Sequence, residues 1–151
     1  MTGEEKPNPI DGAAYYRAIR ERLEHEDGLI VNRLAWLMAS QSFLFTAYAI
    51  VLNGVAIGSG GLIGDLQKEL LRLLPLVGMA STGLIYAGIL AAIRAMGWLV
   101  GEFRNRVPDE AALGLPPIHT PAPIRSFGLA APAILPAVFL LLWVYLLVAP
   151  R

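Results

Sequence analysis

The densest group of residues that could do chemistry in this chain of 151 residues is the run Glu24-His25-Glu26-Asp27. Carboxylates beside an imidazole can bind a divalent cation or respond to pH, since histidine titrates near physiological pH. His25, Glu26 and Asp27 are therefore the candidate metal ligands. Consecutive positions on a helix point in several directions, whereas metal ligands must converge on one ion. We therefore predict no metal site, and expect solvated or paired charges, for instance Arg22 with Glu26 at i,i+4 spacing.

No other motif indicates catalysis. The sequence contains no His-rich metal motif, no nucleophile motif and no Gly-rich loop that opens a phosphate-binding helix. It also contains no cysteine, which excludes disulfides, thiolate metal sites and cysteine nucleophiles. We expect neither an enzyme nor a bound cofactor. We also expect no nucleic-acid binding, because acids match the basic residues near the N-terminus.

Three apolar stretches, residues 34–52, 73–97 and 128–149, must position these side chains. A helix needs about 20 predominantly apolar residues to cross the hydrocarbon core, because lipid offers the backbone no hydrogen bonds. The composition agrees, since 56% of the residues are apolar and only 16% are charged. The sequence therefore predicts an all-α polytopic membrane protein with three transmembrane helices.

The remaining residues divide into flanking segments. Residues 1–10 are predicted to form a flexible tail. Residues 11–33 are predicted to form a cytoplasmic or juxtamembrane amphipathic helix, either continuous with the first span or broken near Gly28 and lying flat on the membrane. Residues 53–72 are predicted to form a glycine-rich loop and a short amphipathic turn. Residues 98–127 are predicted to form a cytoplasmic proline-rich loop, in which His119 has no evident partner.

The positive charges are distributed unequally between the two predicted sides of the membrane. Nine lie in the N-terminal segment, the second loop and its flanks, and three lie elsewhere. The first group comprises Lys6, Arg17, Arg20, Arg22, Arg33, Arg94, Arg104, Arg106 and Arg125, and the second comprises Lys68, Arg72 and Arg151. Because short positively charged loops stay in the cytoplasm, the N-terminus is predicted inside and the C-terminus outside.

If the first helix is continuous, a helical wheel places one set of mostly polar positions within an arc of about 100°. The set comprises Arg22, Glu26, Arg33, Leu37, Ser40, Gln41, Leu44 and Tyr48. Gln41 lies near mid-span, where an amide is costly unless it meets a partner or water. In an oligomer that turned this face inward, Arg33 would stand at the mouth of a pore, with Leu37 and Leu44 as constrictions. Alternatively, Ser40 and Gln41 hydrogen-bond a neighbouring helix of the same chain.

The second span carries small residues at intervals of four. They are Gly83, Ala87, Ala91 and Ala95, with Gly88 and Ala92 beside them. Small residues at this spacing let helices approach closely in lipid. We predict that they pack against another helix of the same chain or against a second subunit. Replacing Gly83 or Ala87 by leucine is then expected to disrupt helix packing.

Residues 25–36, continuing to residues 40–48, resemble a segment of small multi-pass bacterial membrane proteins of uncharacterised function. The resemblance covers about a sixth of the chain. It implies a bacterial cytoplasmic (inner) membrane and no activity to carry over. It also implies that the juxtamembrane acids, Asn32, Arg33 and Ser40-Gln41 belong to one unit.

Hypotheses from different functional classes follow. The leading one is a homo-oligomeric ion channel or pore lined by the polar face of the first span, which would require a symmetric assembly. Its ion selectivity stays open, since Arg33 at the mouth would favour anions and Glu26 would favour cations. The alternative is an accessory or scaffold subunit of a larger membrane complex, without transport activity of its own. The expected partners are the lipid bilayer and either further copies of the chain or that complex.

Overall fold

The computed structural model describes residues 12–58, 61–107, 114, 116–118 and 122–149. Within these ranges the chain forms three helices, α1 (Gly12–Ala56), α2 (Leu62–Arg106) and α3 (Ala122–Val148). Each helix contains a stretch that is long and apolar enough to cross a membrane. The prediction of an all-α chain with three such helices is confirmed. The predicted tail and His119 lie outside the described residues.

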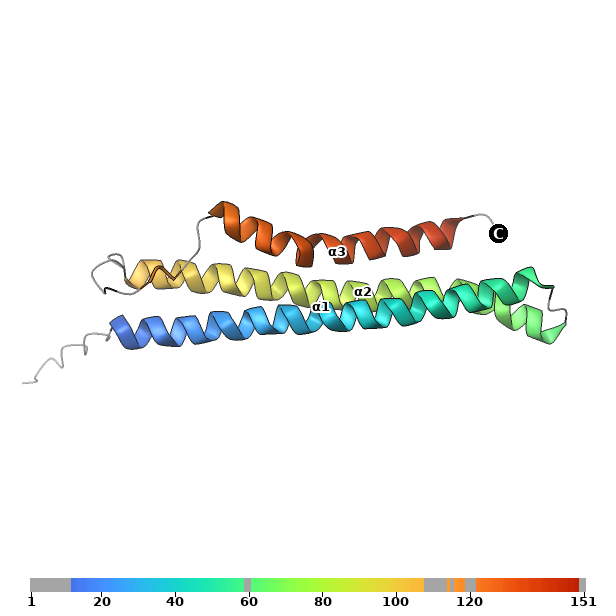
Figure 1. The fold of residues 1–151 in the computed structure, drawn as a ribbon, viewed down its shortest axis with the longest axis horizontal. Helices are drawn as coiled ribbons and strands as arrows, with labels where there is room; N and C mark the ends of the chain where they lie inside the picture. The colour runs from blue at the N-terminus through green and yellow to red at the C-terminus, as the bar shows by residue number, and fades with distance from the viewer. Residues whose placement is uncertain (1–11, 59–60, 108–113, 115, 119–121, 150–151) are drawn as a thin grey trace, which may run out of the picture.

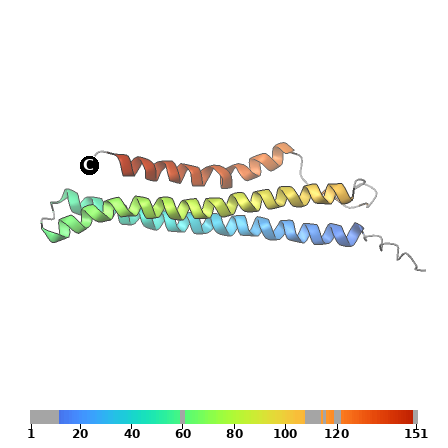
Figure 2. The same cartoon turned by 180° about the vertical axis from the view of Figure 1, so that it is seen from behind.

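The helices form an elongated bundle in which α2 packs against both of its neighbours. Figures 1 and 2 show α1 and α2 antiparallel, with α3 alongside α2. The start of α1 and the end of α2 lie at one end of the bundle, and the start of α3 is directed toward the same end. This up-down-up order is the one that the charge argument assumes, while the membrane side on which each end lies stays a prediction.

The α1–α2 hairpin packs along its length through a regular seam. Each helix has 45 residues and is about 68 Å long at 1.5 Å per residue. Buried positions recur every three, four or seven residues in most of the seam, the spacing of antiparallel coiled coils, with one interval of eleven in α1. In α2 they are Gly64, Leu71, Pro75, Gly78, Thr82, Ile89, Ala92, Leu99 and Phe103, and in α1 they are Tyr16, Ile19, Ile30, Leu37, Gln41 and Tyr48.

The third helix lies beside the middle of this hairpin. Near the start of its apolar part, Leu129 packs against a cluster containing Ile30 and Ile89. Near its other end, Leu146 packs against a cluster containing Tyr48. Residues 12–29 of α1, about 27 Å of helix, therefore extend beyond the level of Leu129. Figure 1 shows the hairpin reaching past α3 at both ends.

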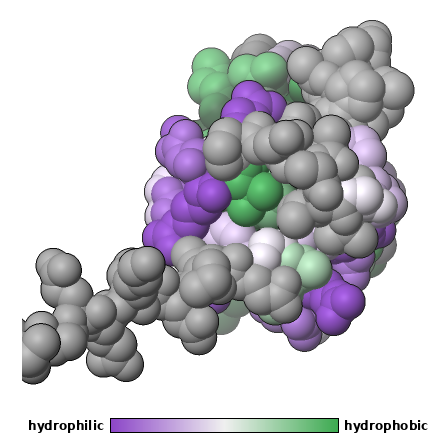
Figure 3. Space-filling model, turned by 90° about the vertical axis from the view of Figure 1, so that its left-hand side faces the viewer, coloured by the Kyte–Doolittle hydropathy of each residue, from purple (hydrophilic) through white to green (hydrophobic). Residues whose placement is uncertain are grey.

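A separate apolar cluster closes the end of the hairpin that holds the start of α1. Tyr16 and Phe103 meet edge to face, with ring centroids 6.0 Å apart, and Ile19 and Leu99 complete the cluster. The hydroxyl of Tyr16 donates to the carbonyl of Pro116 at 2.9 Å, which attaches the segment after α2 to α1. Figure 3 views this end and shows hydrophobic atoms next to a hydrophilic strip.

Both interhelical segments are shorter than predicted. Residues 98–106, assigned to the proline-rich loop, are helical because Leu99 and Phe103 are buried against α1. Residues 53–56 and 62–72, assigned to the glycine-rich segment, are also helical.

The structure also changes the predicted start of the third helix and decides between the two alternatives for the first helix. Helix α3 begins at Ala122 rather than at residue 128, since proline at position 123 is compatible with a first helical turn, where N–H groups have no intrahelical partner. Helix α1 continues through Gly28 without a break, so the broken alternative is wrong. The extension of α1 into the cytoplasm stays a prediction.

Candidate functional site

The three helices meet at Gln41, Ser81 and Trp143, a group we call the Gln41 site. Gln41 of α1 and Trp143 of α3 are completely buried. The indole Nε1 of Trp143 donates to Oε1 of Gln41 at 2.5 Å, and Nε2 of Gln41 donates to Oγ of Ser81 at 3.3 Å. Ser81 in turn donates to the carbonyl of Gly78 at 3.1 Å. A chain of hydrogen bonds thus joins all three helices within their apolar parts.

Aromatic rings and a glycine surround the indole of Trp143. The ring of Phe45 stacks on it, with ring centroids 4.3 Å apart and an angle of 3° between the ring planes. The ring of Tyr48 meets it edge to face, with ring centroids 6.1 Å apart. On the opposite helix, a Cβ added at Gly78 would overlap the indole. Gly78 therefore provides the space that lets Trp143 reach Gln41, and any larger residue there would displace the ring.

The environment of Gln41 follows from the cost of a polar group in hydrocarbon. An amide that faces lipid loses its hydrogen bonds to water, so a mid-span glutamine is expected to find protein partners. Gln41 finds them on α2 and α3, which matches the alternative in which it bonds a neighbouring helix of the same chain. Ser40 does not follow that alternative, because its hydroxyl donates to the Leu37 carbonyl of its own helix at 3.0 Å.

The predicted polar face of the first span is largely occupied within the chain. Leu37 and Tyr48 are buried, and Leu44 packs against the cluster around Trp143. Arg33 donates from Nη1 to the carbonyl of Gly88 on α2 at 2.8 Å. In this conformation, therefore, the face from Arg33 to Tyr48 contacts α2 and α3, and it would line a lumen only if these helices separated.

The contact between Arg33 and Gly88 is a second place where a glycine of α2 accommodates a polar side chain of α1. A Cβ at Gly88 would lie 3.2 Å from Nε of Arg33. The missing side chain leaves the Gly88 carbonyl open to the guanidinium, and a charged donor makes a stronger hydrogen bond than a neutral one. Arg33 is half-buried, so the contact holds a positive charge at the level where α3 begins its apolar part.

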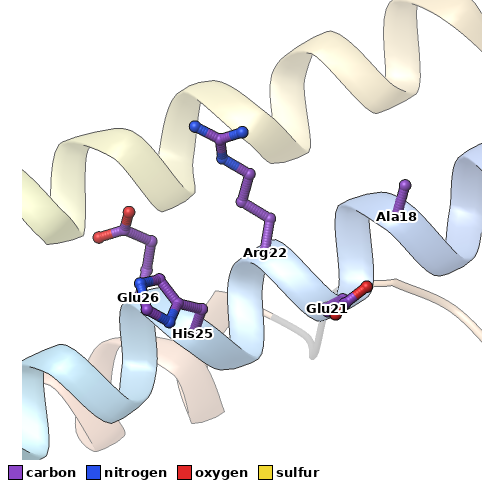
Figure 4. A pocket seen from close by; sticks show the side chains of 5 residues that line it. All are labelled: Ala18, Glu21, Arg22, His25 and Glu26. Atoms are coloured by element: carbon purple, nitrogen blue, oxygen red, sulfur yellow. The ribbon is translucent and has the colours of Figure 1, made fainter.

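The charged run before the first span forms a shallow surface hollow. Ala18, Glu21, Arg22, His25 and Glu26 line it, and Figure 4 shows Arg22 and Glu26 projecting in a similar direction. Across the described part of the chain, no three His, Cys, Asp or Glu residues are grouped so that they could hold a metal ion.

The ion pair in this run also differs from the one predicted from i,i+4 spacing. Arg22 and Glu26 do not pair, whereas Nε of Arg20 lies 3.1 Å from a carboxylate oxygen of Glu24. Both spacings are i,i+4, but Glu26 is half-buried near the seam while Arg22 is exposed.

We call the small residues that recur at intervals of four in α2 the ribbon, which comprises Gly83, Ala87, Ala91 and Ala95. The first three of them do not carry the packing within the chain. Ala87 and Ala91 are exposed, and a Cβ at Gly83 would meet nothing within 4 Å. Ala92, beside the ribbon, is buried against Ile30. The expectation of packing within one chain is therefore wrong for Gly83, Ala87 and Ala91, and contact with a second subunit stays a prediction.

Sequence reasoning missed the partners of Gln41. Trp143 could have been recognised as a candidate, because it carries the only side-chain N–H donor in the third span, and buried indoles usually find an acceptor. Gly78 carried no comparable signal, since it lies outside the four-residue ribbon. Ser81 was equally open, because a serine in a membrane helix can satisfy itself through its own backbone.

Comparisons of this chain with protein-family models, with curated proteins and with solved structures found no match.

Proposed function

We propose that this chain is a small structural subunit of the bacterial cytoplasmic membrane that packs on a larger membrane complex and forms no pore of its own. The observation that carries the proposal is the state of Gln41. Its side chain is completely buried. Its amide nitrogen donates a hydrogen bond to α2, and its amide oxygen accepts one from α3. The most polar group in the middle of the first span is thus unavailable to a lumen.

The shape of the hairpin supports a role in assembly. Residues 12–29 of α1 and the last turns of α2 continue past the level at which the apolar part of α3 begins. The cluster of Tyr16, Ile19, Leu99 and Phe103 packs the two helices of this extension together. With the N-terminus in the cytoplasm, as the charge distribution predicts, the extension would present the exposed charges of residues 17–27 to a cytoplasmic partner.

The ribbon residues Gly83, Ala87 and Ala91, of which the two alanines are exposed, support an intermolecular contact inside the membrane. Two helices approach most closely where both present small residues, and this ribbon is not used within the chain. The contact would serve a larger complex or a homo-oligomer equally well. A homo-oligomeric channel would have to be lined by surfaces other than the Gln41 face.

The test is ion flux measured on the purified protein in liposomes, together with its mass in nanodiscs and in the native membrane. We expect flux no greater than that of empty liposomes, and a larger assembly in native membrane extracts than for the protein expressed alone. Gln41→Leu and the exposed control Phe43→Leu, two positions away, should then give the same background flux.

Flux above background that Gln41→Leu changes and Phe43→Leu does not would overturn the proposal in favour of the pore. A closed ring of identical mass in both preparations would also contradict it. Conversely, a native assembly that loses mass specifically when Ala87 is replaced by leucine would identify the ribbon as the contact.

A further inference from the structure

The first turns of α2 divide into three sectors with different surroundings. At 100° per residue, three sets of side chains occupy separate thirds of the circumference of residues 62–75. The sector that faces α1 contains the buried residues Gly64, Leu71 and Pro75. The other two sectors are exposed, and one is apolar while the other is charged.

The side chains of the apolar sector are large and more than half exposed. Leu62 has 77% of its surface exposed, Leu66 57% and Leu73 51%. Ile57, in the turn that precedes α2, reaches 86%. Within the described residues no other helix covers this sector, so in water it would be an apolar patch that soluble proteins usually avoid.

The charged sector pairs its own charges. Nζ of Lys68 lies 3.5 Å from Oδ1 of Asp65, and Nη1 of Arg72 lies 3.4 Å from Oε1 of Glu69. All four side chains are largely exposed. Their charges sum to zero and leave no net field to attract lipids of one sign, yet hydrocarbon would still be a costly environment for them. This sector therefore requires water or headgroups.

One helix surface requires hydrocarbon and the adjacent surface requires water at the same level, so a position inside the hydrocarbon core or fully in water satisfies only one of them. The membrane–water interface satisfies both. Figures 1 and 2 show the first turns of α2 inclined to the rest of the helix, and Pro75 lies within α2 just after them. The apolar sector continues into the exposed surface of α2 at Val77 and Leu84, which faces the bilayer in a membrane-spanning helix.

We propose that residues 62–72 lie in the membrane–water interface at the turn end of the hairpin, with the apolar sector against the acyl chains and the charged sector in the headgroup and water layer. The partner of this surface is the lipid interface itself. The segment then fixes how deep the hairpin sits, since moving outward exposes Leu62 and Leu66 and moving inward buries Lys68 and Arg72. This inference is independent of the function proposed above.

The absence of cysteine from the sequence makes a direct test possible, because each engineered thiol is unique. Leu66→Cys and Lys68→Cys are labelled with bimane in phosphatidylcholine nanodiscs and quenched by doxyl-labelled lipid or by aqueous iodide. Leu141→Cys on α3, 70% exposed, is the lipid-facing reference, and Glu24→Cys is the aqueous one. We expect lipid quenching about twofold or more stronger at position 66 than at 68, and the reverse order with iodide.

Equal lipid quenching at positions 66 and 68 would overturn the proposal, whether both match Leu141 or both match Glu24. A label at position 66 that neither quencher reaches would also overturn it and would indicate a protein partner on the apolar sector. Adding phosphatidylglycerol to the nanodiscs should leave the depth of the label in Leu66→Cys unchanged, because that variant keeps all four charges and they sum to zero. A depth that follows the anionic lipid content would contradict that part of the inference.

Discussion

Replacing Gly78 by alanine should loosen α3 from the bundle, although the change adds a single methyl group. The added Cβ would overlap three atoms of the Trp143 indole, which is completely buried. The ring must move away from α2. Its hydrogen bond to Gln41 and its stacking on Phe45 then weaken together.

The magnitude follows from these losses. A hydrogen bond between membrane helices contributes about 0.6–1.7 kcal/mol, and an aromatic pair about 0.5–1.5 kcal/mol beyond its buried area. Inserting a methyl group into a packed core costs about 1–3 kcal/mol. Because the ring retains part of its contacts after it moves, we expect Gly78→Ala to lower the free energy of unfolding by about 2–5 kcal/mol.

The matched control is Gly83→Ala, five residues away in the same helix. A Cβ at Gly83 would meet nothing within 4 Å, so this change should have little effect or stabilise the helix by up to about 1 kcal/mol. Both variants are unfolded by titration with sodium dodecyl sulfate and followed by circular dichroism. In a background of Trp36→Phe and Trp98→Phe, the emission of Trp143 reports its burial directly and should shift to the red only in Gly78→Ala.

Equal unfolding curves and equal Trp143 emission for Gly78→Ala and Gly83→Ala would refute the packing of Trp143 against α2. Greater destabilisation by Gly83→Ala would instead restore the four-residue ribbon as the packing surface within the chain.

Three further predictions concern the polar contacts between segments. Gln41→Leu should destabilise the bundle by about 1–3 kcal/mol, because it leaves the buried Trp143 N–H without an acceptor, and the indole N–H resonance should move in an NMR spectrum. Arg33→Met keeps most of the side-chain length but removes the donor to Gly88, and should cost about 1–2 kcal/mol in a detergent titration. Tyr16→Phe removes the 2.9 Å bond to the Pro116 carbonyl and should cost about 1 kcal/mol in thermal unfolding, while its neighbour Tyr15→Phe serves as the control and should cost less.

The number and type of helices could be predicted from the sequence because apolar length determines what can cross a bilayer. The helix ends could not, since they depend on contacts between segments far apart in the chain. Residues 98–106 looked like the start of a loop because charges and Pro108 follow the apolar stretch. Burial of Phe103 against Tyr16 keeps them helical, and that contact joins positions 87 residues apart.

The seam of the hairpin was also hidden in the sequence. In water, apolar residues mark the buried face of a helix, but in a membrane the lipid-facing residues are apolar too. Leu84 and Ile89 are equally apolar, yet Leu84 has 77% of its surface exposed and Ile89 has none. Hydrophobic periodicity therefore distinguishes the two faces only outside the apolar stretches, where Tyr16 and Ile19 alternate with charged residues.

The need of Gln41 for a partner could be predicted from the physics of lipid, whereas the identity of that partner could not. A buried amide requires a donor and an acceptor, and several residues could in principle supply them. The structure uses the one arrangement in which a bulky ring from α3 passes a glycine of α2, and Arg33 repeats the pairing with Gly88. In both cases the glycine matters because a polar side chain of α1, or its ring partner, needs the space. The glycines that matter for packing within this chain are therefore those opposite such side chains, whether or not they recur at intervals of four.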